Sequence, residues 1–380
     1  MSAIKKRIYY SWKKLSEILF RKSFANDYYK NDIARFEACK DRKPENQIKH
    51  EMQVLQKYWD CYPYQYYRFD LYRKDCTLSL EELKKYTPYF YMHRLFYPDS
   101  YKEYGVLCED KELTHAMLKG YDVLHPKMIL SSENGNFYDN AGNSISASNA
   151  DAIINESNTA KLFVKPRYGL GGKGIFVYTK NGGSYIDSDK KALDQSLFTN
   201  LLKTEAYIVE EGLVQHTDMN VLYPYSVNTF RIVTECVNGN AKILYSIVRM
   251  GRGGKEIDNA SAGGIYTKID AETGLLADQA YSTNREVFNE HPDTGFVYKG
   301  AKIERWDEIK QFTLAVARKF REIKYMGWDI AFSTDGPSVI ELNHAPGISI
   351  IQDCYGGMRD VMKINPNDLW YKSNFTIKNL

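Results

Sequence analysis

A cluster of four glycines within six residues is the first part of the sequence that suggests chemistry. Residues 164–175 read VKPRYGLGGKGI, with Lys165 before the cluster and Lys173 inside it. Glycines leave little side-chain bulk, so backbone N–H groups in such a loop can turn toward phosphate oxygens. The two lysines would add the positive charge that a phosphate needs. The cluster therefore predicts a phosphate-binding loop, and a plain hairpin with a flexible tip is the alternative.

The residues around this loop distinguish it from three common nucleotide motifs. Gly169, Gly171 and Gly174 satisfy the spacing G-x-G-x-x-G, but a dinucleotide fingerprint needs a helix after the loop. Here Ile175 to Tyr178 are β-branched or aromatic, which predicts a strand. A Walker A loop would need Lys and Ser or Thr after its last glycine. A kinase loop also precedes a strand, but the HRD and DFG motifs do not occur in this sequence.

A second set of candidate residues lies in the segment 327–347, which reads GWDIAFSTDGPSVIELNHAPG. Glu341 and Asn343 are two residues apart on a predicted strand, so they face the same side. The Asp-Gly-Pro turn makes a hairpin that places Asp329 opposite them to within about one residue. Carboxylate and amide oxygens are the ligands that Mg²⁺ prefers. The segment therefore predicts a magnesium site.

The cost of burying charge leaves two interpretations of these acidic residues. An ionised carboxylate among apolar strands is unfavourable unless it binds a metal or pairs with a cation. In the first interpretation, Asp329 and Glu341 hold Mg²⁺ beside the phosphates, and the glycine loop forms the other half of the same site. In the second, Asp329 pairs with an arginine such as Arg231 or Arg249, and Glu341 lies at a solvent edge.

The elements that must position these residues are strands with one prominent helix. Apolar residues recur at three- and four-residue steps across 304–324, which predicts the helix. Further upstream, the sequence predicts a helix over 111–119, a strand over 127–130 and then a hairpin with turns at Asn134-Gly135 and Ala141-Gly142. Mixed strands and helices without strict alternation predict an α+β fold. The later strands are predicted at 162–166, 175–178, 206–209, 229–237, 242–250, 328–333 and 338–342.

Residues 1 to about 105 are predicted to be helical. Ser79 and Glu82 form a capping box, which marks the start of a helix. Seven Lys or Arg residues lie between positions 1 and 24, and apolar residues recur there on one helix face, at Ile4, Ile8, Trp12, Leu15 and Leu19. Such a helix can lie on an anionic membrane surface, and the alternative is a helix that packs on the protein body.

The composition excludes several classes of protein. The chain has 380 residues with 51 basic and 48 acidic side chains, so its net charge of +3 gives no general reason to expect nucleic-acid binding. No run of about 18 apolar residues predicts a membrane-spanning helix. The six cysteines are scattered without a CxxC pair, which favours reduced thiols in a cytosolic protein over disulfides or a zinc site.

Taken together, the sequence between about Asp110 and Gly347 resembles the ATP-grasp superfamily. Three longer stretches, SVNTFRIVT, RMGRGGKEIDNASAGGI and the segment 327–347, resemble more narrowly the sugar-transfer-associated ATP-grasp subgroup. Members of this subgroup are linked to exopolysaccharide or capsule biosynthesis. The segments that carry the wider resemblance are Asp110-Lys111 before His125-Pro126-Lys127, Val164-Lys165-Pro166 with the glycine loop, Ile208 to Leu213, Asn228 to Arg231 with Arg249, and Asp329 with Glu341-Leu342-Asn343.

The resemblance implies ATP and Mg²⁺ as cofactors and a role for each group of residues. Asp329, Glu341 and Asn343 would be the metal ligands. Glu210 would accept a hydrogen bond from the adenine amino group, with surface exposure as its alternative. The catalytic residues would be Arg231 and Arg249, which stabilise the transferred phosphoryl group, and Asn259, which positions the acceptor unless its loop is disordered. The nucleotide would be bound by Lys111, Lys165, Gly171, Gly172, Lys173, Gly174, Glu210, Glu211 and Leu213.

The implied fold is the ATP-grasp fold, in which two α+β lobes clamp ATP. Residues 106–213 would form the nucleotide lobe and 214–370 the metal and acceptor lobe, between the helical region 1–105 and a tail at 371–380. The implied activity is a cytoplasmic carboxylate–amine ligase that forms an acylphosphate of a sugar-linked substrate. The amphipathic pattern of residues 1–24 separately predicts contact with the inner face of the cell membrane, with packing on the protein body as its alternative. The alternatives are a phosphotransferase acting on a hydroxyl, and a non-catalytic nucleotide-binding partner of a glycosyltransferase.

Overall fold

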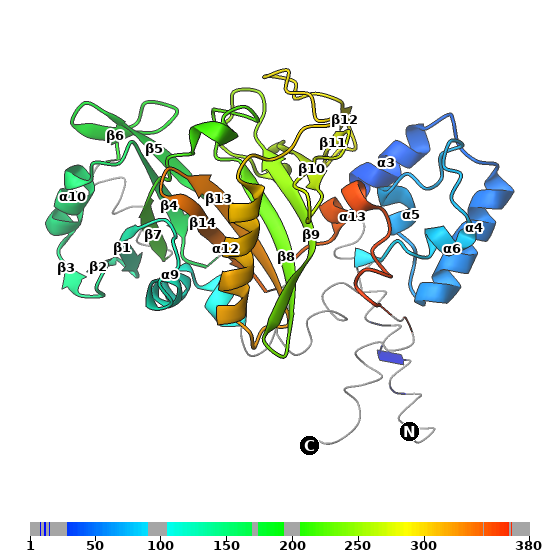
Figure 1. The fold of residues 1–380 in the computed structure, drawn as a ribbon, viewed down its shortest axis with the longest axis horizontal. Coiled ribbons are helices and arrows are strands. Elements are labelled where there is room, and N and C mark those ends of the chain that lie inside the picture. The colour runs from blue at the N-terminus through cyan, green and yellow to red at the C-terminus, as the bar shows by residue number, and fades with distance from the viewer. Residues whose placement is uncertain are drawn as a thin grey trace. The chain divides into compact units, whose positions relative to one another are not determined.

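The computed structural model of the chain divides into two compact units (Figure 1). The first unit comprises the residues up to Pro98 together with those from Gly347 onward, and the second runs from Asp99 to Pro346. The second unit is therefore inserted into the first. The structure describes residues 8, 11, 12, 15, 29–89, 105–168, 174–193, 206–344, 346–364 and 366.

Three of the sequence predictions fall largely or wholly outside the described residues. Of the predicted helix at 1–24, only positions 8, 11, 12 and 15 are described, and these are helical. Positions 169–173 of the glycine loop, which include Gly171, Gly172 and Lys173, lie outside the described residues. The tail 371–380 also lies outside them.

The described part of the first unit is helical, as the sequence predicts, and its core is aromatic. Trp59, Tyr66 and Tyr72 are completely buried. The predicted capping box is confirmed, because the Glu82 carboxylate accepts from the Ser79 N–H at 2.7 Å and the Ser79 hydroxyl accepts from the Glu82 N–H at 3.3 Å. The helices are α3 (Lys30–Ala38), α4 (Glu45–Trp59), α5 (Gln65–Arg68), α6 (Leu80–Leu83) and α13 (Ser349–Tyr355).

Helix α13 belongs to this unit because buried polar contacts bind it to the N-terminal residues. Arg68 and Asp353 form an ion pair at 2.5 Å with both side chains buried. The Gln352 side chain accepts from the Thr87 N–H at 2.8 Å and donates to the Thr87 carbonyl at 3.1 Å. Residues more than 260 positions apart in sequence thus share one core.

The second unit begins with a seven-stranded antiparallel sheet in the order β3-β2-β1-β7-β4-β5-β6. The predicted hairpin after β1 is confirmed, since Asn134 and Gly135 adopt the left-handed conformation at φ 52° and 80°. Strands β4 and β5 are antiparallel neighbours that flank the glycine loop, which confirms the predicted strand–loop–strand element. The strands are β1 (Met128–Glu133), β2 (Asn136–Asp139), β3 (Ser144–Ile145), β4 (Lys161–Pro166), β5 (Phe176–Asn181), β6 (Ser184–Ile186) and β7 (Tyr207–Glu211).

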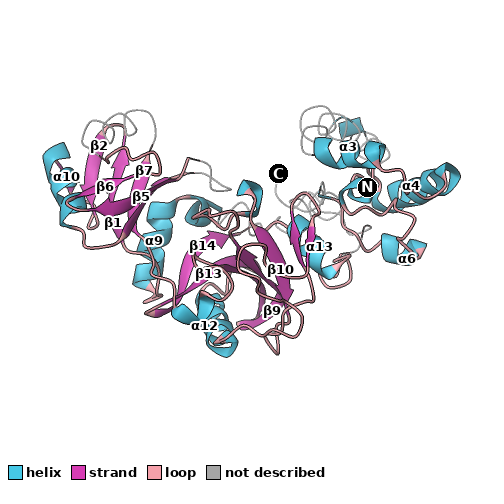
Figure 2. Cartoon of the chain, turned by 90° about the horizontal axis from the view of Figure 1, so that it is seen from above, coloured by secondary structure: helices cyan, strands magenta, loops and turns pink. Residues whose placement is uncertain are grey.

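A second seven-stranded antiparallel sheet follows in the order β12-β11-β10-β9-β8-β13-β14. One face of it packs on helix α12 (Trp306–Lys319), as Figures 1 and 2 show, and the apolar face of α12 contributes Ile309 and Val316 to the largest core. The strands are β8 (Thr229–Val237), β9 (Asn240–Met250), β10 (Ile265–Ile269), β11 (Ala280–Ser282), β12 (Val287–Phe288), β13 (Tyr325–Ser333) and β14 (Gly336–Asn343).

Two further helices of the second unit begin at polar N-caps. Helix α9 (Lys111–Gly120) begins after Asp110, whose carboxylate accepts from the N–H groups of Glu112 and Leu113 at 3.0 and 3.3 Å. Helix α10 (Ala147–Glu156) begins after Ser146 and packs on β1 and β2. The N-cap of α9 fixes the position of Lys111, the first residue of the helix.

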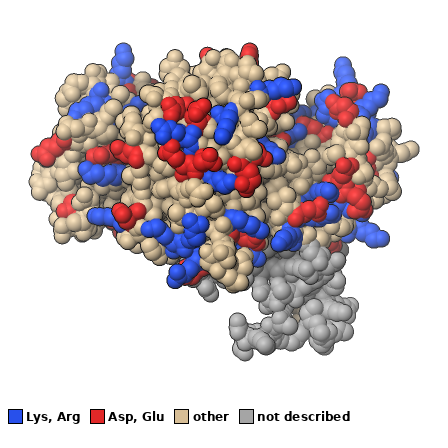
Figure 3. All heavy atoms as spheres, in the orientation of Figure 1, with Lys and Arg blue, Asp and Glu red and all other residues tan. Residues whose placement is uncertain are grey.

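The distribution of charge on the surface agrees with the near-balanced numbers of acidic and basic residues in the sequence. Acidic and basic side chains are interspersed on the face of the molecule in Figure 3. Among the described residues, no helix is both long enough and apolar enough to cross a membrane.

Candidate functional site

The second sheet carries a row of charged side chains across four adjacent strands. Residues paired across antiparallel strands point to the same face. The register pairs Arg231 of β8 with Asp329 of β13, and Asp329 with Glu341 of β14. Thr229, two residues before Arg231, pairs with Arg249 of β9. These charged residues therefore share one face, opposite the apolar face that packs on α12.

Asp329 is the centre of this row and is almost completely buried, with 1% of the residue exposed. Arg231 donates to both carboxylate oxygens through Nε and Nη2, the latter at 2.8 Å, and Arg249 Nη2 donates at 3.2 Å. Burial alone would raise the pKa of Asp329, but the charges of Arg231 and Arg249 outweigh it and lower the pKa. The pairing of Asp329 with arginine, one of the two interpretations left open by the sequence, is therefore present.

Glu341 and Asn343 are two further oxygen-bearing side chains on this face. Burial and the negative charge of Asp329 raise the pKa of Glu341 against the opposing charges of nearby basic groups. The Asn343 Nδ2 atom is buried without a hydrogen-bond partner among the described residues. A turn of the amide about its last bond would present its oxygen at the same place. Glu341 lies on β14, the edge strand of this sheet, and is half-buried, which agrees in part with its predicted alternative at a solvent edge.

The described residues contain no group of three or more Asp, Glu, His or Cys side chains arranged to hold a metal ion. Mg²⁺ does not require such a group, because it is commonly bound by one or two carboxylates together with substrate phosphates. Glu341 and Asn343 fit this pattern, since their donors lie on one face and Asn343 lacks a partner for its buried amide. Asp329 fits it less directly, because both of its oxygens already accept from arginine. Its role as a metal ligand stays a prediction.

The first sheet carries a second buried ionic group on β4, β7 and α9. Lys165 Nζ donates to Glu210 Oε2, and His115 Nε2 lies 2.7 Å from Glu210 Oε1. Only 3% of Glu210 is exposed, which excludes its predicted alternative of surface exposure. Burial would raise the pKa of Glu210, but the charge of Lys165 and the contact with His115 lower it to about 2. An adenine amino group would have to share oxygens that these two side chains already contact.

Lys111 connects the two ionic groups. Its pKa is lowered, first by burial and then by the positive charge of Lys165, while the charges of Glu341 and Glu210 act in the opposite direction. Lys111 therefore lies within electrostatic reach of Lys165 and Glu210 on the first sheet and of Glu341 on the second. Lys111 and Lys165, two of the predicted nucleotide lysines, thus lie near Glu341, one of the predicted metal ligands, although the three are far apart in sequence.

The second glycine-rich segment, residues 252–264, is an anchored loop rather than the disordered one that the sequence allowed. Arg252 Nε donates to the Gly263 carbonyl at 2.7 Å and Lys255 Nζ to the Ala262 carbonyl at 2.5 Å. The loop places the Asp258 carboxylate 3.5 Å from Arg249 Nε. Asn259, the predicted acceptor residue, follows directly and is half-buried. The pKa of Asp258 is raised, mainly by burial and in spite of the charge of Arg249.

The remaining predicted nucleotide residues lie at the ends of β5 and β7. Gly174 precedes β5 and has φ +73°, and a Cβ atom there would meet Pro166 Cγ at 3.0 Å, so this position favours glycine. Glu211 is the last residue of β7 and pairs with Lys127 at 3.2 Å. Leu213 follows it and is half-buried. Their contacts with a nucleotide stay predictions.

The family described as sugar-transfer associated ATP-grasp matches residues 92–361 of the chain, well over half of its length. The chain belongs to this family. No curated protein matches the sequence.

Several solved structures resemble this ATP-grasp protein in fold. The D-alanine–D-alanine ligase of Bacillus anthracis is 12% identical, with 70% of this chain and 69% of that chain covered and a TM-score of 0.38. The corresponding ligase of Helicobacter pylori is 13% identical, with 70% and 63% covered and a TM-score of 0.41. The N5-carboxyaminoimidazole synthetase of Staphylococcus aureus, complexed with ADP, is 11% identical, with 64% and 45% covered and a TM-score of 0.36. This chain spans less than half the length of the last of these.

Two residues of this ATP-grasp protein lie beside the predicted site residues although no sequence motif marked them. His115 lies one helical turn after Lys111 on α9 and reaches Glu210. Arg167 lies two residues after Lys165 and forms a two-bond contact with Asp110. The i, i+4 spacing of Lys111 and His115 was a signal for the first residue. The second gave no signal beyond its place beside the glycine loop.

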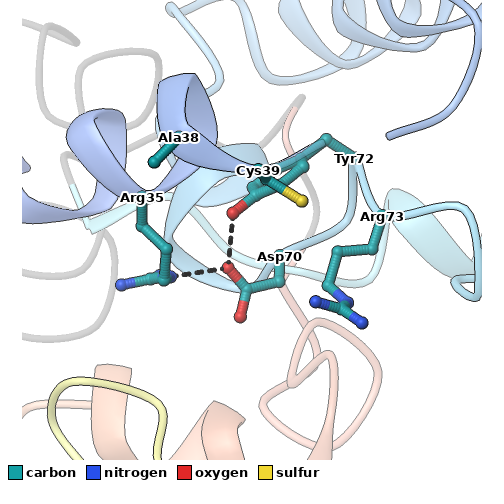
Figure 4. Close-up of a pocket in the computed structure, with 6 residues that line it drawn as sticks. All are labelled: Arg35, Ala38, Cys39, Asp70, Tyr72 and Arg73. Atoms are coloured by element: carbon teal, nitrogen blue, oxygen red, sulfur yellow. Dashed lines mark hydrogen bonds and ion pairs between the residues drawn. The ribbon is translucent and has the colours of Figure 1, made fainter. Parts of the chain in front are cut away.

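A separate polar hollow lies in the first unit, outside the part of the chain that the family matches (Figure 4). Its lining includes Arg35, Asp70, Tyr72 and Arg73. Asp70 accepts from Arg35 at 2.8 Å and from Tyr72 at 2.9 Å, while Arg73 pairs with Asp75 at 2.9 Å. Because each arginine already has a carboxylate partner, this hollow offers little positive charge to a phosphate or carboxylate ligand.

Proposed function

We propose that the protein is an ATP- and Mg²⁺-dependent carboxylate–amine ligase that acts through an acylphosphate. Its substrate is proposed to be linked to a sugar, in exopolysaccharide or capsule biosynthesis. The observation that carries the proposal is the link between the start of α9 and the end of β4, where the Lys111 N–H donates to the Arg167 carbonyl at 3.1 Å. Lys111 and Lys165 are thereby carried on adjoining segments, and the charge of Glu341 on the second sheet also acts on Lys111. A site with basic groups at one end and a carboxylate–amide pair at the other suits a metal–nucleotide complex.

The lysines are proposed to bind the phosphates of ATP. Lys111 and Lys165 bring two positive charges close together; burial disfavours the charge of Lys111, and Glu210 pairs with Lys165. An anion entering beside them would relieve this repulsion. Lys173, on the glycine loop, is proposed to add a third positive charge.

Glu341 and Asn343 are proposed to hold Mg²⁺, with Asp329 beside them. The bound ion would neutralise charge on the β- and γ-phosphate oxygens. Because burial and Asp329 raise the pKa of Glu341, the carboxylate is poised to gain from a nearby cation. Lys111 already supplies part of this favourable charge.

Arg231 and Arg249 are proposed to stabilise the transferred phosphoryl group and the acylphosphate. Both guanidinium groups are fixed by Asp329, so their positions are set before a substrate binds. Asp258, held 3.5 Å from Arg249, and Asn259 are proposed to orient the amine for attack on the acyl carbon. A carboxylate is a poor acyl donor, and its phosphorylation provides a leaving group that the amine can displace.

The experiment is a screen of purified full-length protein with ATP, Mg²⁺ and pairs of uronic acids and amino acids. Free phosphate and an amide product support the ligase, and hydroxylamine trapping reports the acylphosphate. Lys165→Ala and Glu341→Ala should abolish turnover, whereas Lys299→Ala, on an exposed lysine 3.6 Å from Asp278, should leave it unchanged. Normal ATP binding and turnover by both site variants would contradict the assignments.

Other outcomes of the same screen distinguish the two alternatives from the ligase. Phosphate retained on a hydroxyl of the product, with ADP released and no free phosphate, would identify a phosphotransferase. ATP that stays intact with every acceptor while it still binds would identify a nucleotide-binding protein without chemistry.

The basic segment 1–24 is proposed to touch the inner face of the cell membrane. Its positive charges and apolar helix face suit a surface of anionic lipids. The active unit would then work in the cytoplasm, where ATP is available, close to membrane-linked sugar precursors.

A further inference from the structure

We propose that Arg167 is a positioning residue that joins the two chain segments carrying Lys111 and Lys165. The inference rests on the proposed ATP site, because it concerns how these two lysines are held for a nucleotide. Arg167 is two residues after Lys165, and its main partner, Asp110, directly precedes Lys111. One side-chain pair therefore spans the two segments.

The contact between Arg167 and Asp110 is bidentate. Arg167 Nε donates to Asp110 Oδ1 at 2.8 Å, and Arg167 Nη2 donates to Oδ2 at 2.7 Å. The exposed fractions of the two side chains are 16% and 5%. Two parallel charge-assisted hydrogen bonds in a mostly buried setting fix distance and orientation together.

The backbone reinforces this contact at the same place. The Lys111 N–H donates to the Arg167 carbonyl at 3.1 Å, and Asp110 forms an isolated antiparallel bridge with Tyr168. The Arg167 N–H in turn donates to the Ala206 carbonyl at 2.7 Å, next to strand β7. The start of α9 is thus joined to the end of β4 by both backbone and side chains.

The charges around Arg167 favour a positioning role over direct phosphate binding. Its Nη1 atom lies 2.6 Å from Glu112 Oε2 and 3.6 Å from Glu133 Oε2, in addition to the contact with Asp110. The guanidinium therefore faces three carboxylates, whose combined negative charge exceeds its single positive charge. Glu112 itself accepts from Ser131 Oγ at 2.9 Å, and this hydrogen bond holds the Glu112 carboxylate beside Arg167. A phosphate would find no excess positive charge at Arg167.

The two lysines need such a constraint because their charges repel each other. Lys165 acts on Lys111 to disfavour its charged form, and burial acts in the same direction. Without a fixed link, the start of α9 could move away from β4 and relieve this repulsion. The link at Arg167 keeps both ammonium groups close, so the nucleotide does not have to bring them together when it binds.

The test measures binding of ATP with Mg²⁺ to the full-length protein by isothermal titration calorimetry. Arg167→Lys keeps the charge but loses the bidentate geometry, and Asp110→Asn keeps an N-cap acceptor for α9 while removing the ion pair. Arg305→Lys is the matched control, because Arg305 also pairs with two carboxylates, at 3.1 and 2.7 Å, but on an exposed surface. Circular dichroism and thermal unfolding show that each variant is folded at the assay temperature.

We expect Arg167→Lys and Asp110→Asn each to bind ATP about tenfold more weakly than wild type, and Arg305→Lys to bind it as wild type does. The variant that combines Arg167→Lys with Asp110→Asn should bind ATP no more weakly than whichever of the two single variants has the lower affinity. In the Arg167→Lys background, Lys165→Ala should cost much less affinity than it does in wild type, because Lys165 is no longer held in position. If Arg167 only stabilised the fold, Arg167→Lys would lower the unfolding temperature, but Lys165→Ala would cost the same ATP affinity in both backgrounds. If Arg167→Lys does not fold, Asp110→Asn and its combination with Lys165→Ala provide the same test.

The outcomes separate this inference from the proposed function. Wild-type affinity in Arg167→Lys and Asp110→Asn, or losses that add fully to that of Lys165→Ala, would overturn the positioning role alone. Failure of the wild-type protein to bind ATP would overturn the proposed nucleotide site, and the positioning role with it.

Discussion

The pair of Arg231 and Asp329 gives the sharpest test of how the charged face of the second sheet is built. We consider the substitution Arg231→Met, which removes the guanidinium and keeps a long apolar side chain. Asp329 is 1% exposed, so its carboxylate would stay buried with only the 3.2 Å contact to Arg249. Removing one partner of a buried ion pair costs about 3–5 kcal/mol. We expect the lower end, about 3 kcal/mol, because Arg249 remains.

The companion variant replaces both partners, as Arg231→Met with Asp329→Leu. Well-packed apolar residues in place of a buried ion pair are often neutral or stabilising. We therefore expect the double variant to lie within about 1 kcal/mol of wild type, or above it. It should nevertheless lose ATP-dependent turnover, because Arg231 is proposed to stabilise the phosphoryl group. Such a result would mean that the pair is kept for chemistry rather than for stability.

Hydrogen exchange of the β13 amides, read by mass spectrometry, measures the local free energy of opening in this sheet. A loss of about 3 kcal/mol corresponds to exchange roughly a hundredfold faster in Arg231→Met. The reasoning fails if the single variant exchanges at the wild-type rate. It also fails if the double variant is less stable than either single variant, because the buried charges would then contribute net stability.

Three further predictions concern the other parts of the molecule. The pKa of Glu210 is lowered to about 2 in the folded protein, against about 4.3 in the unfolded chain, so its ion pair stabilises the fold above pH 4.3 and this stabilisation is lost as pH falls toward 2. The free energy of unfolding in urea should therefore depend less on pH between 5 and 2 in Glu210→Gln than in wild type. Gly264→Ala would place a Cβ atom 2.3 Å from the Asp258 carbonyl oxygen, and the displaced loop should lower turnover about a hundredfold, whereas Gly183→Ala, with open space around it, should not. Deletion of residues 1–24 should reduce sedimentation with anionic lipid vesicles at low salt.

Each of these three predictions has an outcome that contradicts it. Equal pH dependence in wild type and Glu210→Gln would mean that the buried ion pair does not hold the carboxylate in its charged form. Turnover at the wild-type rate in Gly264→Ala would mean that the position of Asp258 is unimportant for the reaction. Equal vesicle binding with and without residues 1–24 would mean that this helix serves the protein body instead.

Local patterns in the sequence were sufficient to predict the strands that carry the charged face, β8, β9, β13 and β14, and the pairing of Asp329 with Glu341. The strand predicted over 229–237 matches β8 at both ends, and Asp329 pairs with Glu341 as the hairpin argument required. These features follow from periodicity and turn residues within about 20 positions. The short strands β10 to β12 were not predicted, since segments of two to five residues show too little alternation to be recognised.

Contacts between distant segments could not be predicted in the same way. Arg231 was a possible partner for Asp329 by charge, but the shared use of Asp329 by Arg231 and Arg249 depends on the order of strands in the sheet. Likewise, His115 and Lys165 share Glu210 only because α9 lies beside β4 and β7. A sequence shows which side chains are able to ionise, whereas the fold determines which of them are buried in contact with one another.

The insertion of the second unit into the first limits how the chain can be divided for expression. A fragment that runs from residue 99 to residue 380 would contain α13 without its N-terminal partners. The Asp353 carboxylate would lose Arg68, and Gln352 would lose the backbone of Thr87, so an apolar and charged surface would be exposed together. Such a fragment is expected to aggregate, whereas one ending at Pro346 would avoid this liability.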